Sequence, residues 1–313
     1  MTPQPPLRIG TRKSPLAMWQ AEYVSGRLQA LGFSVEMVPI TTSGDVFQGS
    51  LAQSNGVGLF TKEIQRALLE GRCDIAVHSL KDLPTIPVEG LTLAAVPPRE
   101  DPADCLVSRD QKKLDSLAPG SVIGTGSPRR RAQLFQHRPD LKVADIRGNV
   151  ETRLKKVADG QYDAVILALA GLKRLALENS ITERLSFEQM LPAVGQAALG
   201  LETRTDDPRT IDAVSGLDHP PTHLAVDCER SVLRSLRAGC LAPVAAHAQF
   251  SENVFRMRCV VYSNDYKRWV SAEDRISAEH FVGFEPRHAD NLVAGILDQL
   301  RQQHVEELID TAI

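Results

Sequence analysis

Short apolar runs, each followed by polar or charged side chains, recur along the first two thirds of this chain. Residues 7–11 predict a first strand, and residues 33–40, in which apolar and polar positions alternate, predict a second. Between them, Ser14 and Pro15 are typical of an N-cap and a first helical residue, and they predict a helix that runs towards Leu31. The pattern therefore begins strand, helix, strand.

A second helix and a third strand follow, and the third strand ends in charged residues. Thr61 predicts the start of a helix over residues 62–70, and the apolar part of residues 73–82 predicts a buried strand of a parallel sheet. Ligands of open α/β sheets bind beyond the carboxyl ends of the strands, so Lys81 and Asp82 lie where chemistry is expected. The alternative is that both are ordinary solvated loop charges.

The same order of elements appears a second time in the chain. Residues 123–128 match residues 9–15, and residues 160–166 match residues 71–77. The first copy is the longer one because it carries an extra Gly-rich loop, residues 43–58, which is a candidate lid. The repeat indicates two similar α/β lobes.

Beyond the second lobe the pattern predicts a crossing strand and a smaller domain. Residues 192–201 predict a strand that crosses back between the lobes. The chain then changes to a helix, three strands and a final helix, predicted at residues 222–236, 246–250, 255–262, 268–273 and 289–302. We therefore predict an α/β protein with two similar periplasmic-binding-protein-like lobes and a small α+β C-terminal domain with an antiparallel sheet. The predicted domains are residues 1–97 with 198–216, residues 98–197, and residues 217–313.

Composition narrows the range of functions. The chain has 313 residues and a formal net charge of −3, which argues against a broad nucleic-acid-binding surface. The first residues lack the basic and apolar parts of a signal peptide, and no apolar run approaches the ~18 residues of a membrane span. We therefore expect a cytoplasmic protein with no membrane partner. Separately, we expect it to be a monomer.

The cysteines are few and widely spaced. There are five, with no Cys-x-x-Cys pair, which predicts reduced thiols and no metal site. Cys240 differs from the others because it follows Gly239, a predicted helix end, and so falls on a predicted loop. A thiol on such a loop is accessible to chemistry in a way that a core cysteine is not.

Arginine supplies 26 of the 36 basic residues, and guanidinium groups bind carboxylates through two parallel hydrogen bonds. A polycarboxylate ligand is therefore plausible. Many of the basic residues follow predicted strands and should project towards one cleft: Arg129, Arg130 and Arg131 after Ser127-Pro128, Arg147 and Arg153 around Asn149, Lys173 with Arg174, and Arg12 with Lys13. Surrounded by them, Asp82 would keep its charge and could stabilise a cationic intermediate. The alternatives are a solvated helix face or a nucleic-acid patch, although the interleaved aromatic residues of such a patch are missing here.

Several long motifs give the chain a resemblance to the porphobilinogen deaminase (hydroxymethylbilane synthase) family along almost its whole length. The matching segments are residues 8–17, His78-Ser79-Leu80-Lys81-Asp82-Leu83-Pro84, Gly124-Thr125, Arg129-Arg130, Arg147-Gly148-Asn149 with Arg153, residues 170–174, Pro192-Ala193-Val194-Gly195-Gln196, and Gly239-Cys240. The resemblance implies a transferase of porphyrin and heme biosynthesis. Such an enzyme joins four porphobilinogens head to tail with loss of ammonia, and then releases hydroxymethylbilane by hydrolysis.

The same resemblance implies a role for each matched residue. Cys240 would carry a dipyrromethane cofactor through a thioether, and Asp82 would be the catalytic residue that contacts pyrrole nitrogens. The implied cofactor-binding residues are Lys81, Ser79, Thr125, Ser127, Arg129, Arg130 and Asn149. The implied porphobilinogen-binding residues are Arg12, Ser14, Phe60, Arg147, Arg153, Arg174 and Gln196.

Some positions depart from the family pattern. Residues 53–57 lack the lysines that are common in the family, Ala197 replaces the glycine that usually follows Gln196, and Leu241-Ala242 replaces a more polar residue.

Two alternatives remain open. His78 is a candidate base or a packed, hydrogen-bonded side chain. The rival function is a two-lobed binding protein that holds an anionic polycarboxylate without chemistry.

Overall fold

The computed structural model describes residues 5–42, 61–239, 242–277 and 286–309. The chain divides into two compact units, and each is described by itself. The first unit comprises Met1–Glu100 and Ala197–His223, and the second comprises Asp101–Gln196 and Leu224–Ile313.

A five-stranded sheet forms the centre of the first unit, with the strand order β2-β1-β3-β10-β4. The strands are β1 (Leu7–Thr11), β2 (Val35–Pro39), β3 (Ile75–Ser79), β4 (Leu91–Ala95) and β10 (Leu199–Arg204). Strands β1, β2 and β3 are parallel, whereas β10 runs antiparallel to both of its neighbours. The carboxyl end of β3 therefore lies beside the start of β10, where Ser79 pairs with Leu199.

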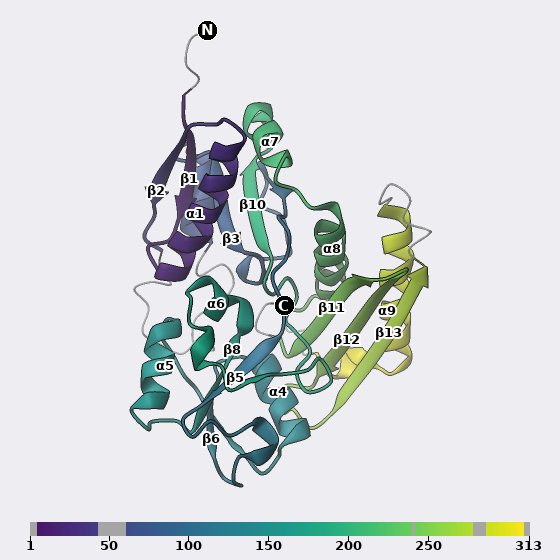
Figure 1. Ribbon diagram of the computed structural model, residues 1–313. Coiled ribbons are helices and arrows are strands. Elements are labelled where there is room, and N and C mark those ends of the chain that lie inside the picture. The colour runs from purple at the N-terminus through teal and green to yellow at the C-terminus, as the bar shows by residue number, and fades with distance from the viewer. Residues whose placement is uncertain (1–4, 43–60, 240–241, 278–285, 310–313) are drawn as a thin grey trace. The chain divides into compact units, whose positions relative to one another are not determined.

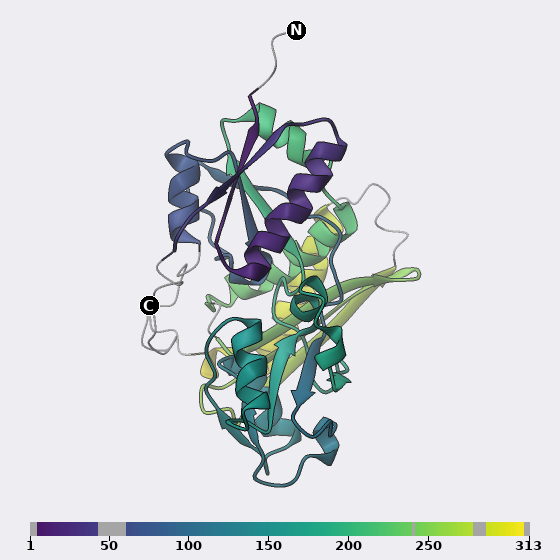
Figure 2. The same ribbon diagram turned by 60° about the vertical axis from the view of Figure 1, so that its left-hand side comes forward.

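Helices cover both faces of this sheet. Helix α1 (Pro15–Ala30) and helix α3 (Lys62–Leu69) lie on opposite sides of the strands, as Figure 2 shows, and the further helix α7 (Pro208–Ser215) packs against β4 and β10. Ile75 and Val77 of β3 share a core with α1, whereas Ala76 shares one with α3. Successive side chains of a strand point to opposite faces, so β3 needs a continuous apolar run to fill both cores.

The second unit contains a sheet with the same plan, in the order β7-β6-β8-β5-β9. Figure 1 shows its strands β5, β6 and β8. Its strands are β5 (Asp104–Ser108), β6 (Val122–Gly124), β7 (Lys142–Ala144), β8 (Ala164–Ala168) and β9 (Glu183–Arg184), and its helices are α4 (Pro128–His137), α5 (Val150–Ala158) and α6 (Leu169–Arg174). Strands β6, β7 and β8 are parallel and β5 is antiparallel to β8. The predicted repeat is therefore present in the structure, strand by strand.

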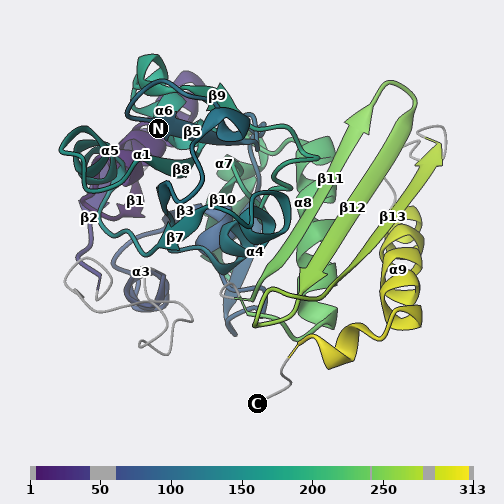
Figure 3. The ribbon, with the colours of Figure 1, turned by 90° about the horizontal axis from the view of Figure 1, so that it is seen from below.

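The C-terminal part of the second unit is a three-stranded antiparallel sheet (Figure 3). The strands of this part are β11 (Val244–Ser251), β12 (Val254–Tyr262) and β13 (Trp269–Ser277), and its helices are α9 (Pro286–Gln302) and α8 (Pro220–Ser235), of which the first four residues belong to the first unit. Residues of α8, α9 and all three strands share one core, in which Phe255 is fully buried. Buried Glu229 of α8 accepts a hydrogen bond of 2.7 Å from the Gly195 amide and so ties this core to the segment before β10.

The described residues also form single turns of 3-10 helix at Leu80–Asp82, Leu114–Ser116, Glu178–Ser180 and Val305–Glu307. In the part of the chain that the structure describes, no helix combines the length and the apolar character that crossing a bilayer requires.

The predicted fold class is confirmed, but several elements differ from the predictions. The crossing strand begins at Leu199 rather than at residue 192, and strands β4, β5 and β9 were not predicted. Thr61 occupies the N-cap position of α3, yet its side chain makes no capping hydrogen bond. Helix α8 ends at Ser235, before Gly239. The division into three domains stays a prediction, and the candidate lid of residues 43–58 lies outside the described residues.

Candidate active site

Asp82 lies just beyond the carboxyl end of β3, on a single turn of 3-10 helix. Leu80, the first residue of this turn, is fully buried, and its amide donates a 3.0 Å hydrogen bond to the Ala198 carbonyl beside β10. Leu83 is buried on the other side of the turn, and its amide donates to the Leu80 carbonyl. The two leucines anchor the turn and leave Lys81 and Asp82 half-buried.

The start of α1 lies on the same pocket. Ser14 is the N-cap of α1, and its hydroxyl accepts a hydrogen bond from the Ala17 amide, while Pro15 fills the first turn without needing an acceptor. The remaining free amides of a first turn, together with the helix dipole, favour an anionic group. Arg12 precedes this turn directly after β1, so a side-chain cation and a helix N-terminus come from one short segment.

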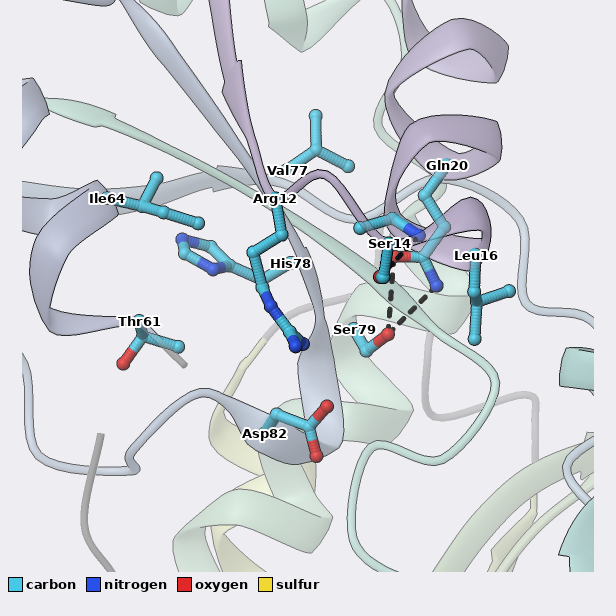
Figure 4. A pocket seen from close by; sticks show the side chains of 11 residues that line it. Arg12, Ser14, Leu16, Gln20, Thr61, Ile64, Val77, His78, Ser79 and Asp82 are labelled. Carbon is cyan, nitrogen blue, oxygen red and sulfur yellow. Dashed lines mark hydrogen bonds between the residues drawn. The ribbon is translucent and has the colours of Figure 1, made fainter. Parts of the chain in front are cut away.

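These residues line a pocket that Figure 4 shows from close by. The Arg12 side chain points towards the Asp82 carboxylate, and Ser79 faces α1, where Gln20 donates a hydrogen bond of 2.8 Å to the Ser79 hydroxyl. The lining residues are Arg12, Ser14, Leu16, Ala17, Gln20, Thr61, Ile64, Val77, His78, Ser79 and Asp82. Four predicted site residues, Arg12, Ser14, Ser79 and Asp82, are thus brought together in the first unit.

A buried polar network adjoins this pocket through His78, which is the only residue of the network that the sequence analysis singled out. His78 Nε2 is 3.1 Å from Glu202 Oε2, and Gln65 Nε2 donates to Glu202 Oε1 at 3.0 Å. All three side chains are buried. The interpretation of His78 as a packed, hydrogen-bonded histidine is therefore confirmed, and its carboxylate partner comes from β10, far along the chain.

In the second unit, two helix N-termini follow neighbouring parallel strands. Ser127 caps α4 after β6, and its hydroxyl accepts from the Arg130 amide, while Thr125 Oγ1 accepts from the Ser127 amide at 3.2 Å. Asn149 caps α5 after β7, and its Oδ1 accepts from the Thr152 amide at 2.8 Å. Two helix N-termini at one edge of a sheet make that edge suited to anions.

Three further arginines from the sequence prediction, Arg147, Arg153 and Arg174, are half-buried: Arg147 lies between β7 and α5, Arg153 is in α5, and Arg174 is the last residue of α6. Arg153 Nε donates to the Gly148 carbonyl at 2.9 Å. Gly148 itself has φ +109°, and a Cβ there would lie 2.6 Å from Thr152 Cγ2, so only glycine fits this turn. The turn sets the position of Asn149 and Arg147 on either side of it.

Arg129 and Arg130 differ from the prediction that they project into a cleft. Both side chains are buried, and both donate to the Asp104 carboxylate: Arg129 Nη2 to Oδ2 at 2.8 Å, and Arg130 Nη2 to Oδ1 at 2.7 Å. Gln196 Nε2 donates to the same oxygen as Arg130, at 2.9 Å. Burial alone would raise the pKa of Asp104, but the charges and hydrogen bonds of the two arginines outweigh it and lower the pKa to about 2.

This network fits a ligand with carboxylate groups. Two guanidinium cations and one carboxylate leave one net positive charge at the sheet edge, next to the N-terminus of α4. Arg129 Nε is also buried without a hydrogen-bond partner among the described residues. Both features would favour an incoming carboxylate.

Two predicted site residues, Cys240 and Phe60, lie outside the described residues. The other four cysteines are buried and not disulfide-bonded. Burial raises the pKa of the Cys73 thiol to about 11 and those of Cys105, Cys228 and Cys259 to about 12. Thiols of this kind are inert near neutral pH. Within the described ranges, no group of three or more His, Cys, Asp or Glu side chains is placed to hold a metal ion.

The fold and the site define a class of protein: repeated α/β sheets that offer arginines and helix N-termini to an anionic ligand, with a carboxylate in the pocket of the first unit. Residues 7–212 match the family model described as "Porphobilinogen deaminase, dipyromethane cofactor binding domain", and residues 223–294 match "Porphobilinogen deaminase, C-terminal domain". A curated porphobilinogen deaminase from Syntrophotalea carbinolica is 50% identical over 254 residues, which are 80% of this chain and 81% of that protein. The chain belongs to the porphobilinogen deaminase family, whose cofactor is dipyrromethane.

Two solved bacterial structures are similar to this chain at low sequence identity. The BvgS VFT2 domain of Bordetella pertussis is 16% identical, with a TM-score of 0.41, over 67% of this chain and 84% of that one. A periplasmic substrate-binding protein of an ABC transporter from Coxiella burnetii is 15% identical, also with a TM-score of 0.41, over 72% of this chain and 96% of that one. The description of the fold above rests on the strand orders rather than on these similarities.

Proposed function

We propose that this protein is a hydroxymethylbilane synthase, a transferase that joins four porphobilinogens head to tail and releases the linear product by hydrolysis. In each condensation the C–N bond of an aminomethyl group breaks, ammonia leaves, and a C–C bond forms to the free carbon of the preceding pyrrole, which loses a proton. The observation that carries this proposal is the position of Asp82, on a rigid turn at the end of β3 with Arg12 pointing towards it.

Asp82 is the proposed catalytic residue. Loss of ammonia leaves a positive charge delocalised over the pyrrole ring and its nitrogen. A carboxylate that accepts the pyrrole N–H lies where this charge develops, and it stabilises the charged state more than the neutral substrate. The buried Leu80 and Leu83 hold the Asp82 backbone in place, so little reorganisation is needed when the charge appears.

The cationic side chains have the complementary task of holding carboxylates. Arg12 and the N-terminus of α1 would hold the acetate or propionate group of porphobilinogen beside Asp82. We assign substrate binding also to Ser14, Phe60, Arg147, Arg153, Arg174 and Gln196, and cofactor binding to Ser79, Lys81, Thr125, Ser127, Arg129, Arg130 and Asn149. Phe60 is the exception to the carboxylate-holding task, because a phenyl ring has no hydrogen-bond donor. Polycarboxylate ligands need this many donors because each carboxylate takes a bidentate partner to be held in one orientation.

Cys240 is the proposed attachment point of the dipyrromethane, through a thioether. When bound, the dipyrromethane supplies the terminal pyrrole carbon to which the first substrate is joined. The proposal is supported by the four other thiols, which are buried and have raised pKa values, so they are poor nucleophiles. We further propose that the enzyme acts as a monomer in the cytoplasm.

The intact mass of the denatured protein tests this function. Purified protein should carry the added mass of one dipyrromethane, the Cys240→Ser variant should lack it, and the Cys259→Ala variant, which changes a buried thiol, should keep it. Incubation with porphobilinogen should then add further pyrrole units in steps. A protein that keeps its unmodified mass and gains none with porphobilinogen would instead be a binding protein for an anionic ligand.

A further inference from the structure

Asp104 is a fully buried carboxylate that the proposed reaction does not use directly. It is the first residue of β5 and pairs with Ala168, the last residue of β8. Because β5 runs antiparallel, its first residue lies at the edge where the parallel strands of this sheet end. This is the edge at which open α/β sheets bind ligands.

Asp104 orders three side chains that belong to the proposed site. It accepts from Arg129, from Arg130 through both Nη2 and Nε, and from Gln196. Each guanidinium group also donates a hydrogen bond to a backbone carbonyl: Arg129 Nη1 to that of Leu191 at 2.6 Å, and Arg130 Nη1 to that of Ile166 at 2.9 Å. Each arginine is therefore held at two points and has one orientation.

The first unit shows that the fold does not require these charges. Residues 163–166 match residues 74–77 in sequence, so β8 corresponds to β3, and Ala168 to Ser79. Since Asp104 pairs with Ala168 and Leu199 pairs with Ser79, Asp104 and Leu199 occupy the same place in the two sheets. Leu199 is 3% exposed and packs into the apolar core of the first unit.

The two arginines have uncharged counterparts as well. Ser127 and Ser14 are the N-caps of corresponding helices, each followed by proline. Counting from the caps, Arg129 corresponds to Leu16 and Arg130 to Ala17. The same architecture is thus built once with a buried ionic cluster and once without it. Burying a carboxylate and two guanidinium groups is costly, and apolar replacements of buried ion pairs are often neutral or stabilising. The cluster therefore serves something other than the fold.

We propose that Asp104 is a positioning residue for ligand binding in the second unit. It neutralises one of the two arginine charges, so that both guanidinium groups stay together in the interior, and it leaves one net positive charge to attract a carboxylate group of the pyrrole chain. This inference rests on the proposed function, because it concerns the same ligand.

The Asp104→Asn variant tests this role, since it keeps the size of the side chain and removes its charge. The loaded fraction, measured as the intact-mass population that carries dipyrromethane, should fall. The porphobilinogen concentration for half-maximal turnover should rise about ten- to a hundredfold, while the turnover of each loaded molecule changes much less. Asp104→Glu, which retains the charge, should restore part of the loading.

Asp74→Asn is a matched control. Asp74 is a buried carboxylate of the first unit that also binds two arginines, Arg8 and Arg204, but it lies next to the start of β3, at the opposite end from Asp82. This variant should lower the thermal midpoint and leave loading and half-saturation unchanged. If Asp104→Asn behaves in the same way as Asp74→Asn, Asp104 has only a structural role and the inference is overturned.

A second variant keeps the test decisive if Asp104→Asn does not fold. Asp104→Leu combined with Arg129→Leu and Arg130→Ala copies the first unit into the second, and it should fold but carry no dipyrromethane. Failure of this triple variant to fold, or normal loading in it, would overturn the inference. If the parent protein neither carries the cofactor nor consumes porphobilinogen, the proposed function and this inference are both wrong. If parent and variant carry the cofactor to the same extent, only this inference is wrong.

Discussion

The Ser79 hydroxyl accepts a hydrogen bond of 2.8 Å from the Gln20 side-chain amide. This contact joins the last residue of β3, which directly precedes the turn that carries Asp82, to helix α1, whose N-cap is Ser14. The carboxylate and the helix N-terminus of the candidate active site are therefore held in one frame by side chains from two segments.

Breaking this contact should loosen that frame. Gln20→Met and Ser79→Ala should each lower the free energy of unfolding by about 1 kcal/mol, because Ser79→Ala takes this partner from the buried Gln20 amide and Gln20→Met takes it from the half-buried Ser79 hydroxyl. Chemical denaturation of both single variants and of the double variant measures the coupling, expected at about 0.5–1 kcal/mol. Additive effects, with a coupling near zero, would show that the hydrogen bond contributes nothing.

Asp82→Asn should remove turnover without unfolding the protein. The substitution keeps the shape of the side chain and removes the charge that faces the developing cation, so turnover should fall on the order of 100- to 1,000-fold. The thermal midpoint should stay close to that of the parent, since Asp82 is only half-buried on the surface of its turn. Near-normal turnover in a folded variant would refute the catalytic role of this residue.

The reactivity of the thiols separates Cys240 from the other cysteines. The native Cys73, Cys105, Cys228 and Cys259 thiols are buried with raised pKa values and should resist iodoacetamide near neutral pH. Protein without cofactor should gain one adduct at Cys240, located by peptide mass mapping, and protein with cofactor should gain none. Rapid labelling of two or more cysteines in the native state would contradict this expectation.

Ala197→Gly should stabilise the protein. Ala197 has φ +69°, in the left-handed region where an L-residue with a Cβ is strained, and it stands where the family usually has glycine. Glycine relieves this strain, but it also increases the conformational entropy of the unfolded chain, which offsets part of the gain. The net free energy of unfolding should rise by about 0.5–1 kcal/mol. The neighbouring substitution Ala198→Gly is the control and should destabilise, because Ala198 is buried and has no positive φ.

Asp104 should also make stability depend on acid pH. Its folded pKa of about 2 lies below the ordinary value of 3.8, so its ionic interactions stabilise the protein fully above the unfolded pKa and are lost as pH falls towards 2. The stability difference between parent and Asp104→Asn should therefore shrink by about 2 kcal/mol between pH 5 and pH 2. Urea unfolding of both proteins across this range measures it. A difference that does not change with pH would mean that the Asp104 carboxylate is not charged in the parent.

Local signals in the sequence were sufficient for much of the fold. Apolar periodicity identified β1, β3 and the three C-terminal strands, and the Ser-Pro pairs identified the starts of α1 and α4, because caps and strand patterns depend on neighbouring residues. The internal match of residues 160–166 with residues 71–77 identified the two sheets. The position of Asp82 beyond β3 followed from the apolar run of that strand, which ends in charged residues.

The tertiary structure decided which polar residues meet. Strand β5 directly follows a Pro-rich segment, and nothing local indicated that Asp104 would face Arg129 and Arg130, 25 and 26 positions further along the chain. The contact of His78 with Glu202 spans 124 positions. Such partners depend on the order and direction of strands, which long-range packing selects and local propensity does not. The sequence by itself therefore determined the repeated α/β plan and the family. The burial of Arg129 and Arg130 and their pairing with Asp104 depend on the antiparallel position of β5 beside β8, which only the tertiary structure decided.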